Sequence, residues 1–151
     1  MTPIVAVPQE PAAEYGQPAP PAGEGDTDRP RRRVWTWETN ARDARERARR
    51  ERLPLVVYVR ADWSAGALAM DRDVWSDPRI LFHPLALVPL RLDVTGGPDA
   101  ELLADEFRVQ AIPTTILVDA DGGEAMRLEG ARSVDEVLSA LRNLERDLED
   151  R

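Results

Sequence analysis

Ser64 is the residue best placed for chemistry, because it lies where a strand gives way to a helix. The β-branched run at 55–60 predicts a buried strand, and helix-forming residues over 65–75 predict a helix. A serine at that junction could act as a nucleophile or could cap the free backbone N–H groups of the first helical turn. No histidine lies near it in sequence to serve as a base, so the cap is favoured.

The remaining chemical motifs are absent or isolated. His83 is the single histidine of the chain and stands beside Pro84 without a second metal ligand nearby, so we expect no metal site. The sequence contains no phosphate-binding glycine loop, no zinc-protease motif, no nucleophile elbow and no cysteine. We therefore expect no cofactor and no small-molecule substrate.

Five short segments, in a consistent order and spacing, resemble the thioredoxin superfamily, and most closely the branch that includes the C-terminal domain of the transmembrane thiol–disulfide reductases. They are Ala61-Asp62-Trp63, Ser76-Asp77-Pro78, Leu92-Asp93-Val94-Thr95, Ile112-Pro113-Thr114 and Asp119-Ala120-Asp121-Gly122. The resemblance covers roughly residues 35 to 145. It implies a thioredoxin-like α/β fold, with a central mixed sheet of about four to five strands flanked by helices. It also implies a cis Ile112–Pro113 peptide bond facing the motif around Ser64.

The same resemblance would place cysteines at Ser64 and Ala67 and a buried acid at Tyr58, and all three are missing. A serine hydroxyl is hardly ionised near neutral pH and forms no disulfide, so thiol exchange is excluded. The sequence thus predicts a redox-inactive protein that is not an enzyme. The alternative is a thiol–disulfide oxidoreductase whose cysteines have been replaced in this chain. Tyr58 argues against it, because removing thiols would not require a change there.

The other elements follow from local signals. A parallel strand is expected over 87–94, a helix over 99–107, and strands over 114–119 and 124–128 around a turn at 121–123. Ser133 should cap a final helix with apolar residues at helical spacing. That apolar stripe extends through Leu144 and Leu148, where it is predicted to outrun the domain and be free for a partner.

The N-terminal part differs in composition from the rest. Residues 1–33 hold seven of the thirteen prolines, which predicts a disordered tail before a domain over 34–151. Residues 29–52 carry ten arginines and four acids, a charge of +6, so the rest of the −8 chain carries −14. Acidic protein, nucleic acid or anionic lipid could dock on this basic stretch. The simpler explanation is a solvated helix with ion pairs four residues apart: Glu38/Arg42, Asp43/Arg47 and Glu46/Arg50.

Within that basic helix, Ala41, Ala44 and Ala48 form a narrow stripe suited to packing on a sheet, with Trp35, Trp37 and Leu53 at its ends. The negative total charge argues against general nucleic-acid coating, and no apolar run is long enough to span a membrane. The N-terminus does not resemble a signal peptide, so we expect a cytoplasmic protein, with any membrane association indirect.

Two surfaces could bind a protein partner of unknown identity. One is the groove that holds an extended peptide in redox-active relatives, between Trp63, Ser64, Ala65 and Gly66 on one side and Ile112, Pro113 and Thr114 on the other. The other is an outer surface for a structural or accessory subunit of a larger assembly, made by Arg31, Arg32, Arg33, Arg45, Arg49, Leu144 and Leu148. The outer surface is slightly favoured, because the loss of sulfur removes the use that the groove has in redox-active relatives.

Overall fold

Strand β1 (Leu55–Arg60) lies inside a four-stranded sheet in the computed structural model, which describes residues 34–150. All six residues of β1 are buried, as expected for a strand covered on both faces. It pairs in parallel with β2 (Val88–Asp93) and antiparallel with β3 (Thr114–Val118). A hairpin from β3 to β4 (Glu124–Glu129) gives the order β2-β1-β3-β4. The expected mixed sheet is confirmed.

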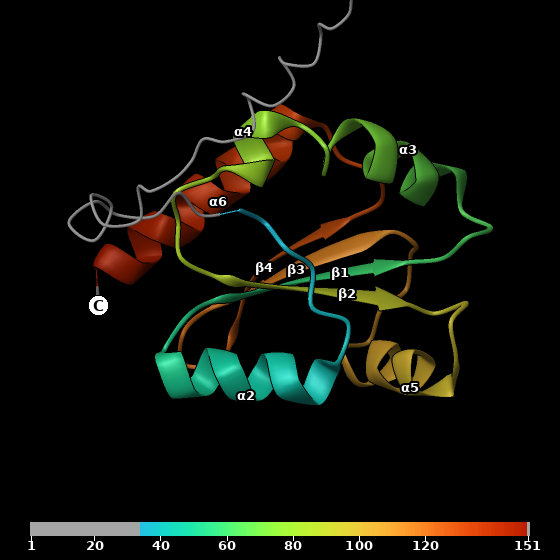
Figure 1. The fold of residues 1–151 in the computed structure, drawn as a ribbon, viewed down its shortest axis with the longest axis horizontal. Coiled ribbons are helices and arrows are strands. Elements are labelled where there is room, and N and C mark those ends of the chain that lie inside the picture. The colour runs from blue at the N-terminus through green and yellow to red at the C-terminus, as the bar shows by residue number, and fades with distance from the viewer. Residues whose placement is uncertain (1–33, 151) are drawn as a thin grey trace, which may run out of the picture. The chain divides into compact units, whose positions relative to one another are not determined.

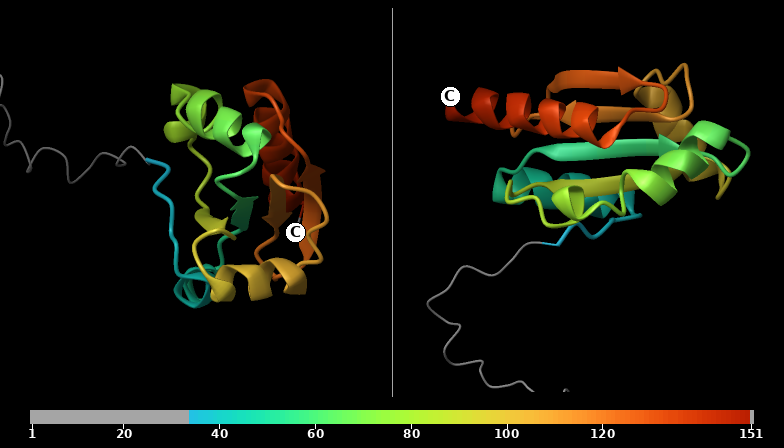
Figure 2. Two further views of the ribbon diagram at one scale, coloured as in Figure 1. Left: turned by 90° about the vertical axis from the view of Figure 1, so that its right-hand side faces the viewer. Right: turned by 90° about the horizontal axis from the view of Figure 1, so that it is seen from above.

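Helices cover both faces of this sheet. Helices α2 (Ala41–Glu51) and α5 (Pro98–Glu106) lie on one face, and α3 (Ala65–Asp73), α4 (Pro78–Leu81) and α6 (Val134–Glu149) lie on the other (Figures 1 and 2). Within residues 34–150 no helix is both long and apolar enough to cross a membrane. The predicted tail, residues 1–33, lies outside the described range.

The sheet separates two apolar clusters, because successive side chains of a strand point to opposite faces. Val57 and Val59 of β1 contribute to the cluster with α2 and α5, whereas Val56 and Tyr58 contribute to the cluster with α3, α4 and α6. Helix α2 uses the expected stripe, with Ala44 and Ala48 buried. Small side chains at these positions let the helix approach the sheet closely.

Side-chain caps set the beginnings of the helices. Asn40 accepts a hydrogen bond from the N–H of Asp43 at the start of α2, and Asp77 caps α4 at Arg79. Ser133 caps α6 in a reciprocal arrangement with Glu136, so the predicted cap there is confirmed. The helix expected over 65–75 ends at Asp73, and the helix expected over 99–107 spans Pro98–Glu106.

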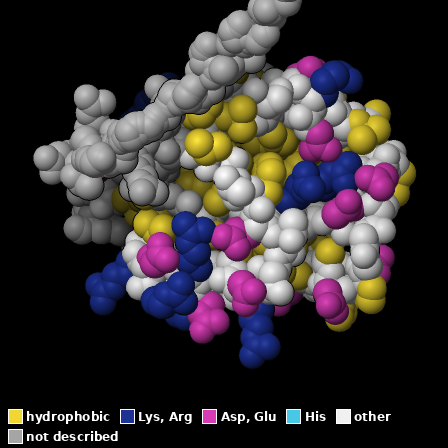
Figure 3. Space-filling model, in the orientation of Figure 1, with side chains coloured by type: hydrophobic (Ala, Val, Ile, Leu, Met, Phe, Trp, Pro, Cys, Tyr) yellow, Lys and Arg dark blue, Asp and Glu magenta, His cyan; other side chains and the backbone are white. Residues whose placement is uncertain are grey.

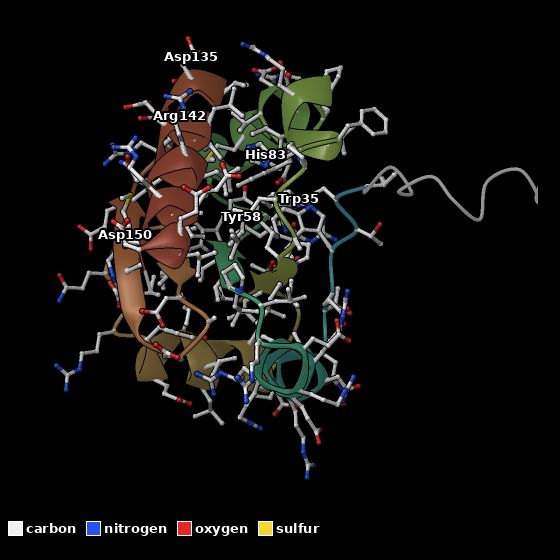
Figure 4. All side chains as sticks on the ribbon, turned by 90° about the vertical axis from the view of Figure 1, so that its left-hand side faces the viewer. Trp35, Tyr58, His83, Asp135, Arg142 and Asp150 are labelled. Atoms are coloured by element: carbon white, nitrogen blue, oxygen red, sulfur yellow. The ribbon has the colours of Figure 1, made fainter. Side chains whose placement is uncertain are left out.

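The placement of Trp35 and Trp37 in line with the alanine stripe of α2 was wrong. Residues 34–39 belong to no helix, and Glu38 forms a parallel bridge with Leu90 of β2. The two tryptophans therefore pack on the opposite face of the sheet from α2, together with Tyr58. Figure 4 shows Trp35 and Tyr58 on this face. The sequence suggested that the two tryptophans continue the helical pattern of α2, but the segment that contains them runs beside β2 before the helix begins.

The predicted ion pairs of the basic helix also differ from those observed. Glu38 precedes the helix, so it cannot pair with Arg42 at a spacing of one helical turn. Arg47 instead contacts Glu38 at 2.7 Å and Glu51 at 3.5 Å. Arg45 reaches α5, where its guanidinium lies 3.0 Å from the Glu106 carboxylate.

Candidate binding groove

The strand-to-helix junction and the loop before β3 meet at the edge of the domain. The Ile112–Pro113 peptide bond is cis, as the resemblance implied. A Cβ atom added to Gly66 would lie 3.2 Å from Cδ of Pro113 and 3.3 Å from Cβ of Ala131. These contacts are tighter than most side chains tolerate, so glycine lets the first turn of α3 approach the cis-proline loop.

Ser64 links the two sides of this junction. Its hydroxyl oxygen accepts a hydrogen bond from the N–H of Ala67 at 3.1 Å, which is the predicted cap of α3. The same hydroxyl donates to the carbonyl oxygen of Ile112 at 3.2 Å. Ser64 is 6% exposed. The hydroxyl is thus engaged both as donor and as acceptor, with no side-chain base among its partners.

The other predicted groove residues differ in exposure. The side chain of Trp63 is 69% exposed, an unusual position for a large aromatic residue. Ala65 is exposed, and Gly66 and Ile112 are half-buried. Ala67 and Thr114 are fully buried, and the hydroxyl of Thr114 donates to the carbonyl of Ala111 at 2.6 Å. The side chain of Thr114 therefore cannot contact a ligand, so its inclusion in the candidate groove was wrong. Pro113 is buried as well.

Tyr58 replaces the acid that the resemblance implied and is completely buried. Its ring lies 5.0 Å from the ring of Trp75 and 5.6 Å from that of Trp37. Its hydroxyl lies 3.0 Å from the carbonyl oxygen of Ala67 and 2.9 Å from a carboxylate oxygen of Asp71. Burial, and then the neighbouring Asp71, raise the pKa of Tyr58 above its ordinary value. The residue therefore stays neutral at physiological pH and donates hydrogen bonds from β1 to α3.

Arg60, at the end of β1, is a buried charge that sequence reasoning missed. Its side chain is 7% exposed, and its guanidinium contacts Asp62 at 3.0 Å, Asp71 at 2.9 Å and Asp93 at 2.6 Å. Burial alone would lower the pKa of Arg60, but the three carboxylates outweigh it and raise that pKa. A buried arginine is stable only with such partners.

The Arg60 cluster connects the end of β1 to helix α3 and to the end of β2. Asp71 accepts hydrogen bonds from both Tyr58 and Arg60, so it joins β1 to α3 twice. Asp93 lies opposite Arg60 in the parallel register of β1 and β2. The sequence did contain this signal, since an arginine and an aspartate end two neighbouring parallel strands.

His83 lies apart from Ser64. Its Nδ1 accepts a hydrogen bond from the N–H of Leu85, and its ring interacts electrostatically with Glu145 and Arg142 of α6. Figure 4 shows His83 and Arg142. Burial lowers the pKa of His83, Glu145 opposes that shift and Arg142 adds to it. Across residues 34–150 no three histidine or acidic side chains come together as a metal site.

The residues predicted to form an outer docking surface are not all exposed in the structure. Leu144 is 1% exposed and belongs to the core beneath α6, so its assignment to a docking surface was wrong. Helix α6 keeps its contact with the sheet one turn further than its sequence spacing indicated. Leu148 is half-buried, Arg45 is half-buried and Arg49 is exposed. Arg31, Arg32 and Arg33 lie outside the described residues.

Comparison with known proteins places this geometry in a family. The sequence profile of the thioredoxin-like domain matches residues 41–145. The chain is 32% identical over 91 residues to the thiol:disulfide interchange protein DsbD of Ralstonia nicotianae. That match covers 59% of this chain and only 15% of the relative.

Solved structures share the fold. DsbH oxidoreductase superposes with a TM-score of 0.63 at 18% identity, covering 79% of this chain and 91% of that one. A thioredoxin from Thermus thermophilus gives 0.63 at 27% identity, covering 74% and 87%. The oxidised C-terminal domain of DsbD from Neisseria meningitidis gives 0.57 at 16% identity, covering 72% and 98%.

Proposed function

The chain belongs to the thioredoxin-like domain family, and because it contains no cysteine we propose that it acts by binding a protein partner without redox chemistry. The proposed binding face is the surface around the exposed Trp63, where the start of α3 meets the loop of the cis Pro113. In this role the protein is an accessory subunit that holds a segment of another protein.

The exposed side chain of Trp63 carries this proposal. An exposed tryptophan loses much contact with water when a partner covers it, and tryptophan is enriched among the residues that dominate binding energy. Three residues after Trp63, Gly66 lets the first turn of α3 pack closely against the cis Pro113. Recognition of an extended peptide through its main chain needs such a shape and no sulfur.

The relative's name describes thiol:disulfide interchange, which requires thiolates. Ser64 supplies only a hydroxyl, and that hydroxyl is committed to Ala67 and Ile112. The same two hydrogen bonds preserve the shape of the groove. In this proposal the chain keeps the ability to bind a peptide but not the ability to exchange thiols and disulfides.

Site-specific photocrosslinking tests this proposal. The photoreactive residue p-benzoylphenylalanine replaces the exposed Ala65 in the full chain, and the matched control carries it at the exposed Arg72 of the same helix. In a lysate of the source cells we expect adducts from position 65, no matching adducts from position 72, and loss of the former after Trp63→Ala. The same adducts from both positions, or adducts that survive Trp63→Ala, would contradict binding in this groove.

A further inference from the structure

A second candidate site lies on the opposite face of the sheet, between α2 and α5. A groove of about 960 Å³ runs from the start of α2 and the end of β2 along α5. Its α2 side carries Arg42, Arg45 and Arg49, which recur at helical spacing and so share one face of the helix. Its α5 side includes Pro98 and Leu102.

The three arginines on the α2 side of this groove differ in whether they form an ion pair. Arg45 is held by Glu106 and lies over the ring of Phe107, with its guanidinium carbon 5.0 Å from the ring centre. Arg42 and Arg49, on either side of it, are exposed and form no ion pair within residues 34–150. Figure 3 shows basic side chains gathered over α2, with acidic ones between them. The pair formed by Arg45 thus fixes the groove, while two guanidinium groups beside it keep their donors available.

The α5 side of the groove is apolar where it is most exposed. Leu102 is 67% exposed, which makes it one of the most exposed large apolar residues of the described chain. It lines the same groove as Arg42 and Arg49. A ligand that matches both sides must therefore combine negative charge with an apolar side chain.

We propose that this groove binds an acidic segment of a partner protein, in which carboxylates pair with Arg42 and Arg49 and an apolar side chain covers Leu102. Guanidinium groups pair with carboxylates through two parallel hydrogen bonds, which gives both strength and orientation. The volume is far larger than one side chain, so the groove accommodates several residues.

Nucleic acid fits this groove less well. The groove contains Asp93, Asp99 and Glu106, which repel a phosphate backbone, and no aromatic side chain on which a base could stack. The total charge of −8 also opposes a long polyanion. A short acidic peptide avoids these penalties because its charges can be limited to the arginine side.

Fluorescence anisotropy with a defined probe tests the site. The probe is a fluorescein-labelled peptide of about 12 residues that is rich in glutamate and contains two leucines. A comparison peptide has glutamine in place of each glutamate. A thymidine oligonucleotide of equal length tests whether nucleic acid binds instead. We expect the full-length protein to bind the glutamate peptide at least about tenfold more tightly than either comparison. We also expect this binding to weaken with salt, because exposed charges are screened.

Matched variants locate the binding. The pair Arg42→Gln and Arg49→Gln should weaken it at least about tenfold, and Arg42→Lys with Arg49→Lys should weaken it less, because lysine keeps the charge but loses the two parallel hydrogen bonds. Leu102→Asn should weaken it about threefold or more through lost apolar contact. The control pair Arg142→Gln and Arg146→Gln, on exposed positions of α6, should change it less than about twofold.

An equal loss with the control pair, tighter binding of the oligonucleotide, or no difference between the two peptides would overturn the proposal. Circular dichroism of each variant establishes that it is folded. This site is independent of the Trp63 groove, so failure of one proposal leaves the other intact.

Discussion

The hydroxyl of Ser64 donates a hydrogen bond to the carbonyl oxygen of Ile112, 3.2 Å away, and so ties the first turn of α3 to the cis-proline loop. In the family this position is expected to hold a cysteine, whose sulfur is a weak hydrogen-bond donor. A serine hydroxyl at the same position is a stronger hydrogen-bond donor than a cysteine thiol, but it cannot carry out thiol exchange. The residue that stands in place of the expected cysteine therefore also ties α3 to the loop before β3.

Ser64→Ala should lower the free energy of unfolding by about 1–2 kcal/mol, because both the helix cap and the bond to Ile112 are lost. Urea unfolding followed by circular dichroism measures the change. Ser76→Ala is the control, since that exposed hydroxyl bonds only to the carbonyl of Arg72, and it should cost no more than about 0.5 kcal/mol. Equal effects of the two substitutions would refute the bridging role of Ser64.

Tyr58→Phe should cost about 1–3 kcal/mol, because Asp71 and the carbonyl of Ala67 lose a buried donor. The difference between wild type and variant should shrink as the pH rises above about 10. Folding raises the pKa of Tyr58, so the unfolded chain ionises first and the stability contributed by neutral Tyr58 is progressively lost. Unfolding curves at several pH values measure this. A difference that stays constant to about pH 11 would contradict the raised pKa.

Arg60→Met should destabilise the domain by about 2–3 kcal/mol, because three carboxylates lose their common partner. The loss is at the lower end for a buried pair, since Asp62 and Asp93 keep part of their contact with water. Arg72→Met is the matched control, because its pair with Asp73 is exposed to solvent, and it should change the free energy of unfolding much less than Arg60→Met. A similar small effect at both positions would show that the Arg60 cluster contributes little.

Asp93 should make the domain sensitive to acid. Although burial opposes the shift, bonds from Thr95 and the charge of Arg60 lower the pKa of Asp93 in the folded protein. Its contribution is therefore present above the unfolded pKa of about 3.9 and lost as the pH falls through the lower folded value. Wild type should lose stability more steeply than Asp93→Asn over this acid range, as measured by urea unfolding at each pH. Parallel curves would rule out this role.

Leu144→Ala should destabilise the domain by about 2–5 kcal/mol, because it opens a cavity in the core beneath α6. Leu148→Ala, one turn later and only half-buried, should cost about 1 kcal/mol or less. Thermal unfolding of both variants decides whether α6 belongs to the domain or to an interface. Equal, small losses would restore Leu144 as a candidate docking residue.

Ser64→Cys with Ala67→Cys should introduce the thiols that the chain lacks. The unmodified protein should not accelerate insulin reduction by dithiothreitol, and the double variant should do so weakly, because Tyr58 supplies no acid for proton transfer. Adding Tyr58→Asp should increase the rate, provided that the triple variant remains folded. The turbidity of reduced insulin measures the rate of reduction, and thiol titration measures the number of free thiols in each protein. Activity of the unmodified chain would contradict a redox-inactive protein.

The sequence alone determined the main strands, the helix caps and the absence of cysteine. The buried strand before Ser64, the caps at Ser64 and Ser133, and the order of the matching segments all depend on residues near one another in the chain. Local hydrogen bonding and hydrophobic periodicity decide such features. The absence of cysteine likewise required no structure.

Only the tertiary structure decided which side chains meet. Asp71, Asp93 and Arg60 come from three different elements, and the pairing of Arg45 with Glu106 joins residues far apart in sequence. The burial of Leu144 and Thr114 depends on what covers α6 and β3, which helical or strand periodicity does not specify. The sequence sets which face a residue occupies within its own element, but the packing of the elements against one another decides whether that face meets solvent, core or a charged partner.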